Sequence, residues 1–76
     1  MIDANRLRQI DTDHNTKVIR LLQPGQEYKT WCYAKQGWAK VARTDSGLLV
    51  KLPGQRKAQP MELAATVQAI VDAHHG

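Results

Sequence analysis

Apolar residues recur at two spacings along the 76-residue chain, and each spacing predicts one kind of element. Near the start, Leu7 and Ile10 are three positions apart, which predicts a short helix within the first ten residues, with Asp3 as its N-cap. The polar run at 11–16 is typical of a loop. Residues 17–22 fit either a helical stripe or a strand that enters a turn. Their β-branched pair leads us to favour the strand.

The middle of the chain alternates apolar and polar residues, which predicts antiparallel strands joined by short turns. We expect these strands at 28–34, 38–43 and 48–52. Glycine-containing turns join them, and Gly47 is free to take a positive φ. This spacing is typical of a β-meander.

The last part of the chain carries the clearest helical pattern. Leu63, Val67 and Ile70 form one apolar stripe. Pro60 is expected at the first helical position, and Glu62 in the first turn, where its charge complements the helix dipole. A C-terminal helix is therefore predicted.

Together these elements predict one small α+β domain over residues 1–76, an antiparallel three- or four-stranded meander with the C-terminal helix packed on one face. Strand alternation then assigns the two faces of the sheet. The face under the helix is expected to hold Tyr28, Thr30, Cys32, Ala39, Val41, Leu48, Val50 and Leu52. The open face is expected to hold Lys29, Trp31, Tyr33, Trp38, Lys40 and Lys51. The opposite facing stays open, because the chain has no Phe and its Trp and Tyr are the only large aromatic core material.

Positive charge is concentrated in the same part of this small basic protein. The chain carries +4 overall, whereas residues 17–57 carry +7, from nine Lys and Arg against Glu27 and Asp45. All four aromatic residues lie between Tyr28 and Trp38. Cations bind phosphates and flat rings stack on bases, so the pattern predicts a non-enzymatic protein that binds DNA or RNA. The expected contact residues are Lys29, Trp31, Tyr33, Trp38, Lys40, Arg43, Lys51, Arg56 and Lys57.

The same residue types also suit a protein partner. Trp, Tyr and Arg dominate the energetics of protein interfaces. The alternative hypothesis is therefore a protein-interaction module or inhibitor, an accessory protein such as a phage or mobile element encodes, with Trp and Tyr anchored in the partner. A homodimer through the open face is a third arrangement.

Signatures of metal binding are incomplete. The run 11–15 matches the first positions of a calcium loop, but Thr16 and Leu22 replace the required glycine and bidentate Glu. His74 and His75 are adjacent, so on a helix they point about 100° apart and share a metal poorly. We expect no metal and no cofactor.

Signatures of catalysis and of export are equally weak. Cys32 lies mid-strand on the predicted core side, where a thiol is an inert small hydrophobe. We therefore expect no enzyme activity. One cysteine and no long apolar run predict a cytoplasmic protein that has no membrane partner.

Overall fold

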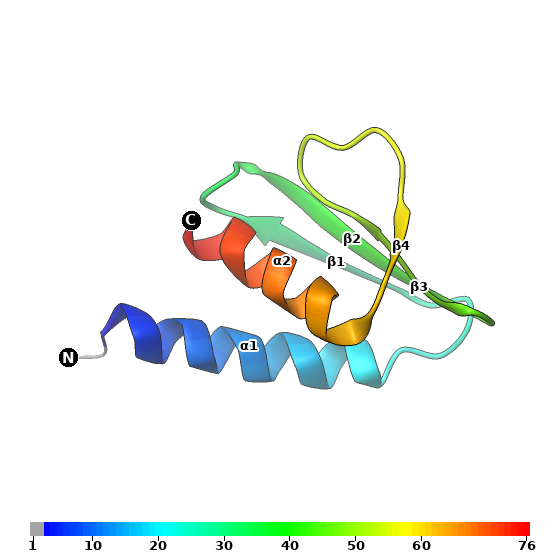
Figure 1. Ribbon diagram of the computed structural model, residues 1–76, viewed down its shortest axis with the longest axis horizontal. Coiled ribbons are helices and arrows are strands. Elements are labelled where there is room, and N and C mark those ends of the chain that lie inside the picture. Colours follow the sequence, from blue (N-terminus) through cyan, green and yellow to red (C-terminus); the bar gives the residue numbers. More distant parts are fainter. Residues whose placement is uncertain (1–2) are drawn as a thin grey trace.

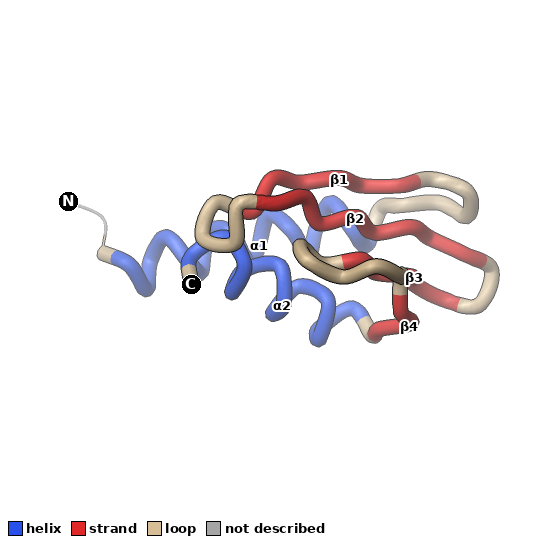
Figure 2. Tube along the Cα trace, turned by 90° about the horizontal axis from the view of Figure 1, so that it is seen from above, coloured by secondary structure: helices blue, strands red, loops and turns tan. Residues whose placement is uncertain are grey.

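The computed structural model describes residues 3–76 and contains two helices and one sheet (Figure 1). Along the chain the elements are α1 (Ala4–Arg20), β1 (Glu27–Cys32), β2 (Gly37–Thr44), β3 (Gly47–Lys51), β4 (Gln59–Met61) and α2 (Leu63–His75). The four strands pair antiparallel in the order β1-β2-β3-β4. Figure 2 shows the two helices gathered on one side of the sheet. The predicted α+β meander with a C-terminal helix is confirmed. No helix in residues 3–76 has the length and apolar character needed to cross a membrane.

Helix α1 is much longer than predicted. It includes residues 11–16, expected as a loop, and the first part of 17–22, where the preference for a strand was wrong. The N-terminal prediction is confirmed, because Asp3 is the N-cap and its carboxylate accepts from the backbone N–H of Arg6 at 2.8 Å. The helix continues through the polar run because Asp11 and Asn15 find partners in distant segments, Asp11 in α2 and Asn15 in β1. The Thr16 hydroxyl donates to the carbonyl four residues earlier, so it needs no partner outside the helix.

Strand β4 takes the place predicted for the start of the C-terminal helix. Pro60 was expected at the first helical position, but it pairs with Leu49 in this edge strand. An edge strand tolerates proline because one side of its backbone needs no donor. Glu62 is the N-cap of α2 rather than a first-turn residue, and its side chain makes no capping hydrogen bond.

The β1–β2 connection also differs from the prediction. β1 ends at Cys32, two residues earlier than expected, and the turn is followed directly by Gly37. Within this turn, Gln36 is the residue that has a positive φ, of 50°. Gly37 is needed for space, because a Cβ there would lie 2.8 Å from the Cβ of Pro53. At the β2–β3 turn the prediction is confirmed, since Gly47 has a φ of 144°.

The core lies between the two helices and one face of the sheet. Ile19 of α1 and Ile70 of α2 meet Val41 and Val50 of the sheet, and all four are fully buried. The predicted facing is therefore confirmed. Of the residues expected under the helix, Cys32, Ala39, Val41, Leu48 and Val50 are buried, and Tyr28, Thr30 and Leu52 are partly buried. The residues expected on the open face are all exposed.

Cys32 is a core residue, as its strand position predicts. Its side chain is fully buried. Burial raises the pKa of the Cys32 thiol, against a smaller lowering by a hydrogen bond from the backbone of Ala39, and the Asp11 carboxylate adds slightly to the rise. The thiol is therefore protonated at neutral pH and closed off from solvent.

Candidate nucleic-acid interface

Three lysines lie side by side across the open face of the sheet. The strand register places Lys29 opposite Lys40, and Lys40 opposite Lys51. All three side chains are exposed. Neighbouring strands are about 4.8 Å apart, so three positive charges start within roughly 10 Å of backbone. We call Lys29, Lys40 and Lys51 the lysine row.

The lysine row works against folding. Like charges directly opposite each other in a sheet are destabilising, by roughly 0.2–1 kcal/mol per pair. Two contacts reduce the repulsion: Lys40 Nζ lies 3.2 Å from Glu27 Oε2, and Lys29 Nζ lies 4.6 Å from the ring centroid of Trp38. Both contacts are exposed and weak. In residues 3–76, Lys51 has no ion-pair partner, so the row keeps most of its positive field.

A pair of tryptophans lies next to the lysine row. Trp31 and Trp38 are opposite each other in the register, and their rings meet edge to face with centroids 5.3 Å apart. Trp31 is 37% exposed and Trp38 51%, while Tyr33 in the following turn is 75% exposed. Only Tyr28, of the four aromatic residues, lies under the helices. The open face therefore offers ring surfaces beside cations.

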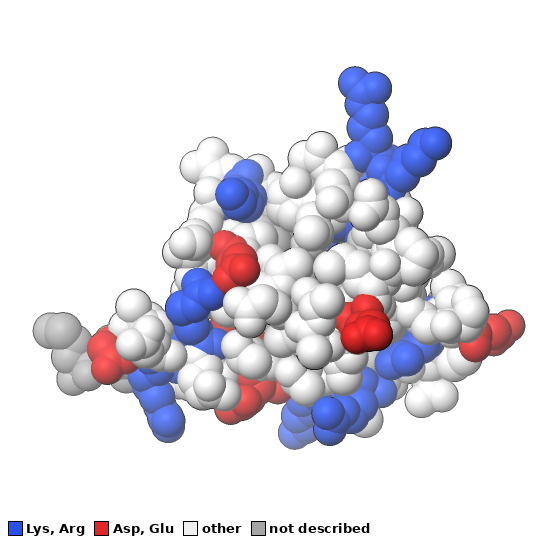
Figure 3. All heavy atoms as spheres, in the orientation of Figure 1, with Lys and Arg blue, Asp and Glu red and all other residues white. Residues whose placement is uncertain are grey.

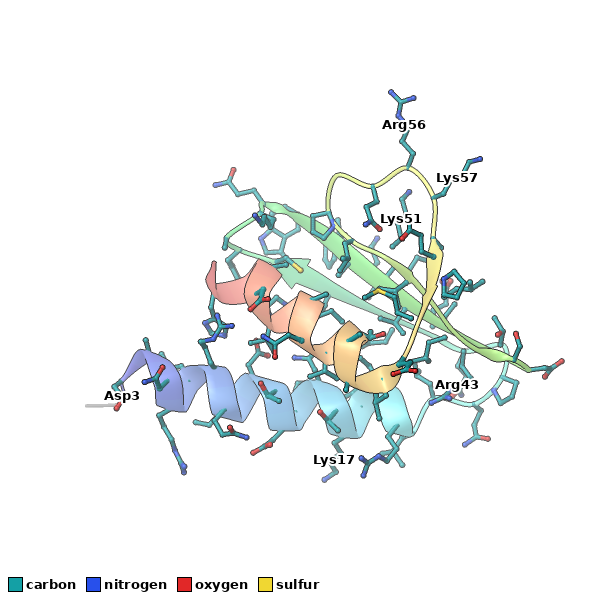
Figure 4. All side chains as sticks on the ribbon, in the orientation of Figure 1. Asp3, Lys17, Arg43, Lys51, Arg56 and Lys57 are labelled. Carbon is teal, nitrogen blue, oxygen red and sulfur yellow. The ribbon has the colours of Figure 1, made fainter. Side chains whose placement is uncertain are left out.

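The other predicted contact residues fall in two places. Arg56 and Lys57 are in the β3–β4 loop and project from the molecule (Figure 4). Arg43 instead lies on the helix side of the sheet, where its Nη2 donates to the carbonyl oxygen of Ile19 at 3.1 Å. That contact satisfies a carbonyl in the last turn of α1, so we leave Arg43 out of the candidate surface.

The helix side of the molecule has a different character. Figure 3 shows this side: white atoms and a few acidic patches occupy its centre, and most Lys and Arg lie around the margin. Some of its charges are paired, as in the ion pair between Arg8 of α1 and Asp72 of α2. The helix side therefore lacks the aligned cations of the open face.

A polar network joins the two helices, and the sequence analysis missed it. Asp11 of α1 lies against the last turn of α2, with its Oδ2 2.6 Å from His74 Nδ1 and 3.0 Å from His75 Nε2. Its Oδ1 accepts from Asn15 Nδ2 at 2.6 Å. Within residues 3–76, no group of three or more His, Cys, Asp or Glu side chains is placed to hold a metal ion. The two adjacent histidines contact one shared carboxylate, that of Asp11.

The network continues onto the inner face of β1. Thr30 Oγ1 lies 3.2 Å from His74 Nε2, and the Tyr28 hydroxyl donates to Asn15 Oδ1 at 3.1 Å. Asn15 is fully buried, so these bonds satisfy polar groups that have lost water. The sequence signal for this network is the i, i+4 spacing of Asp11 and Asn15, which brings two side chains together only on a helix. Because 11–16 is expected as a loop, the sequence does not predict this contact.

Comparison of the chain with protein-family models, with curated proteins and with solved structures found no match. A function for this fold is therefore inferred from the arrangement of its own residues.

Proposed function

We propose that this protein binds nucleic acid, without catalysing a reaction, through the open face of its sheet. The lysine row would hold phosphates, and Trp31 and Trp38 would stack on bases. Arg56 and Lys57 would extend the positive surface from the β3–β4 loop. The observation that carries the proposal is the lysine row itself, aligned by the strand register beside two exposed tryptophans.

The energetics support this proposal. Three aligned lysines oppose folding, and Lys40 alone of the three has a carboxylate partner in the described part of the chain. A polyanion laid across the row would relieve that repulsion and release its own counterions at the same time. Concentrated positive charge also raises the rate at which a polyanion arrives.

The test is the salt dependence of affinity for a labelled single-stranded oligonucleotide. Lys40→Gln and Lys51→Gln are each expected to weaken binding and to lower the slope of log affinity against log salt by about 0.7. Lys17→Gln is the matched control, because Lys17 is an exposed lysine on α1, away from Lys51 (Figure 4). The proposal fails if the row variants keep the wild-type slope, or if Lys17→Gln changes it as much as they do.

A protein partner is the second candidate. Its support is the exposed apolar surface of the open face, where Leu49 is 37% exposed and pairs with Pro60, across the lysine row from the exposed tryptophans. An interface anchored by such side chains persists at salt concentrations that abolish phosphate contacts. A homodimer would use the same surface and would appear as a doubled mass in sizing.

A further inference from the structure

A groove of about 400 Å³ lies along β1, one of the two edge strands of the sheet. Leu7 and Ile10 of α1 line one side of it, and Trp31 and Tyr33 line the other. These four are among the seven large hydrophobic side chains exposed in the described chain. Exposed apolar surface that gathers in one hollow marks a binding site.

The polar groups of this groove suit a neutral ring rather than a phosphate. Among residues 3–76, no Lys or Arg lines it. Its carboxylate, Asp11, is already hydrogen-bonded to two histidines. His14 supplies an imidazole, and Thr30 and His75, which each make one contact in the polar network, keep a further lone pair or ring nitrogen for the edge of a base. The cations lie on the open face and the apolar walls lie in the groove. The open face therefore suits phosphates, and the groove suits a base.

Trp31 connects the two surfaces. It pairs with Trp38 on the open face and also lines the groove. A strand that crosses the lysine row toward β1 therefore arrives at the groove as it passes Trp31.

We infer that the groove receives an unpaired nucleobase, and that the ligand of this protein is a single strand. The inference rests on the proposed function and names its substrate class. A base in a duplex would first have to leave its stack and its pairing partner, whereas a base in a single strand is free to enter.

The first experiment compares three ligands of the same length. They are a single-stranded oligothymidylate of roughly 10 nucleotides, the same backbone with abasic residues, which carries the same number of phosphates, and the duplex of that oligothymidylate with its complement. The oligothymidylate is expected to bind roughly 5- to 100-fold more tightly than the abasic strand, because only the former has bases to stack. The duplex is expected to bind more weakly than the oligothymidylate.

The second experiment locates the base. Tyr33→Ala and Leu7→Ala are expected to weaken binding of the oligothymidylate, with the abasic strand unaffected. Leu21→Ala is the control, because Leu21 is also an exposed leucine, at the end of α1, and does not line this groove. All these side chains are exposed, so circular dichroism should show folded variants.

The outcomes separate this inference from the proposed function. If the abasic strand binds as tightly as the oligothymidylate and the lysine row still sets the salt slope, the groove inference is overturned and phosphate binding stands. If Tyr33→Ala and Leu7→Ala behave like Leu21→Ala, the groove holds no base and the inference is also overturned. If no strand binds even at low salt, both proposals fall.

Discussion

On the inner face of the sheet the apolar residues are buried and the polar ones are hydrogen-bonded, whereas the outer face leaves two tryptophans exposed and aligns three lysines. Folding accounts for most of the inner face, because each buried apolar side chain contributes roughly 1.5–3 kcal/mol and the buried polar side-chain atoms of residues 3–76, apart from Arg43 Nε, have partners. Folding accounts for the outer face only in part, since the cross-strand pair of Trp31 and Trp38 is stabilising whereas the lysine row is destabilising. The lysine row is the feature that the proposed binding of nucleic acid would explain.

The largest expected effect is the difference in stability loss between a substitution in the core and one on the outer face. Ile70→Ala should lower the free energy of unfolding by about 2–5 kcal/mol, because Ile70 is fully buried and its truncation leaves a cavity. Leu49→Ala, on the outer face, should cost less than about 1 kcal/mol. Urea unfolding of both variants measures the difference. Equal losses would mean that the outer face is also a core.

The next effect tests the polar network. Asn15→Leu should lower the free energy of unfolding by about 1–3 kcal/mol, because Tyr28 and Asp11 lose a buried partner. Gln9→Leu is the control, since Gln9 is on the same helix and its hydrogen bond to Asp13 is exposed. Unfolding by heat or urea gives both values. A harmless Asn15→Leu would show that the network does not hold the helices to β1.

The next, smaller effect is that of Lys51→Gln, which should raise stability and lower affinity for nucleic acid. Lys51→Gln removes one like-charge pair and no ion pair seen in residues 3–76, so the free energy of unfolding should rise by about 0.2–1 kcal/mol. The affinity for a single strand should fall at the same time. Urea unfolding and an oligonucleotide titration of the same preparation test this. A variant that loses stability would refute the claim that the row opposes folding.

The smallest effect is a dependence on pH. Because the pKa of Cys32 is raised in the fold, the folded chain keeps the thiol proton to a higher pH than the unfolded chain. The associated stability is therefore complete below the ordinary thiol pKa of about 8.5 and is lost as pH rises through the folded value.

Cys32→Ala isolates this contribution, since all other groups titrate in both proteins. Between about pH 7 and about pH 9.5, wild type should lose more unfolding free energy than Cys32→Ala. Parallel losses would show that Cys32 is not protected by the fold.

The sheet and its two faces were predictable because strand alternation is a local pattern. Lys29, Trp31 and Lys40 could be assigned to one face from their neighbours alone. Their alignment in a row also needed the register, which is set by turn lengths, and the β1–β2 turn was predicted with the wrong boundaries.

Local sequence patterns could not predict the full length of helix α1 or the groove. The polar run at 11–16 contains few apolar residues to mark a helix, and Asp11 finds its partners 63 and 64 residues away in α2. β4 was missed for a similar reason, because Pro60 is as typical of a helix start as of an edge strand. Contacts between distant segments decided each of these cases.

The most direct test of the central claim uses the protein's own fluorescence. The chain has two tryptophans and both lie on the outer face, so their emission reports that surface and, through Trp31, the adjoining groove. Titration with a single-stranded oligonucleotide at low salt should quench the emission, and added salt should restore it as phosphate contacts are lost. If a labelled oligonucleotide binds while the emission of Trp31 and Trp38 stays unchanged, the ligand lies elsewhere and the account of the outer face is contradicted.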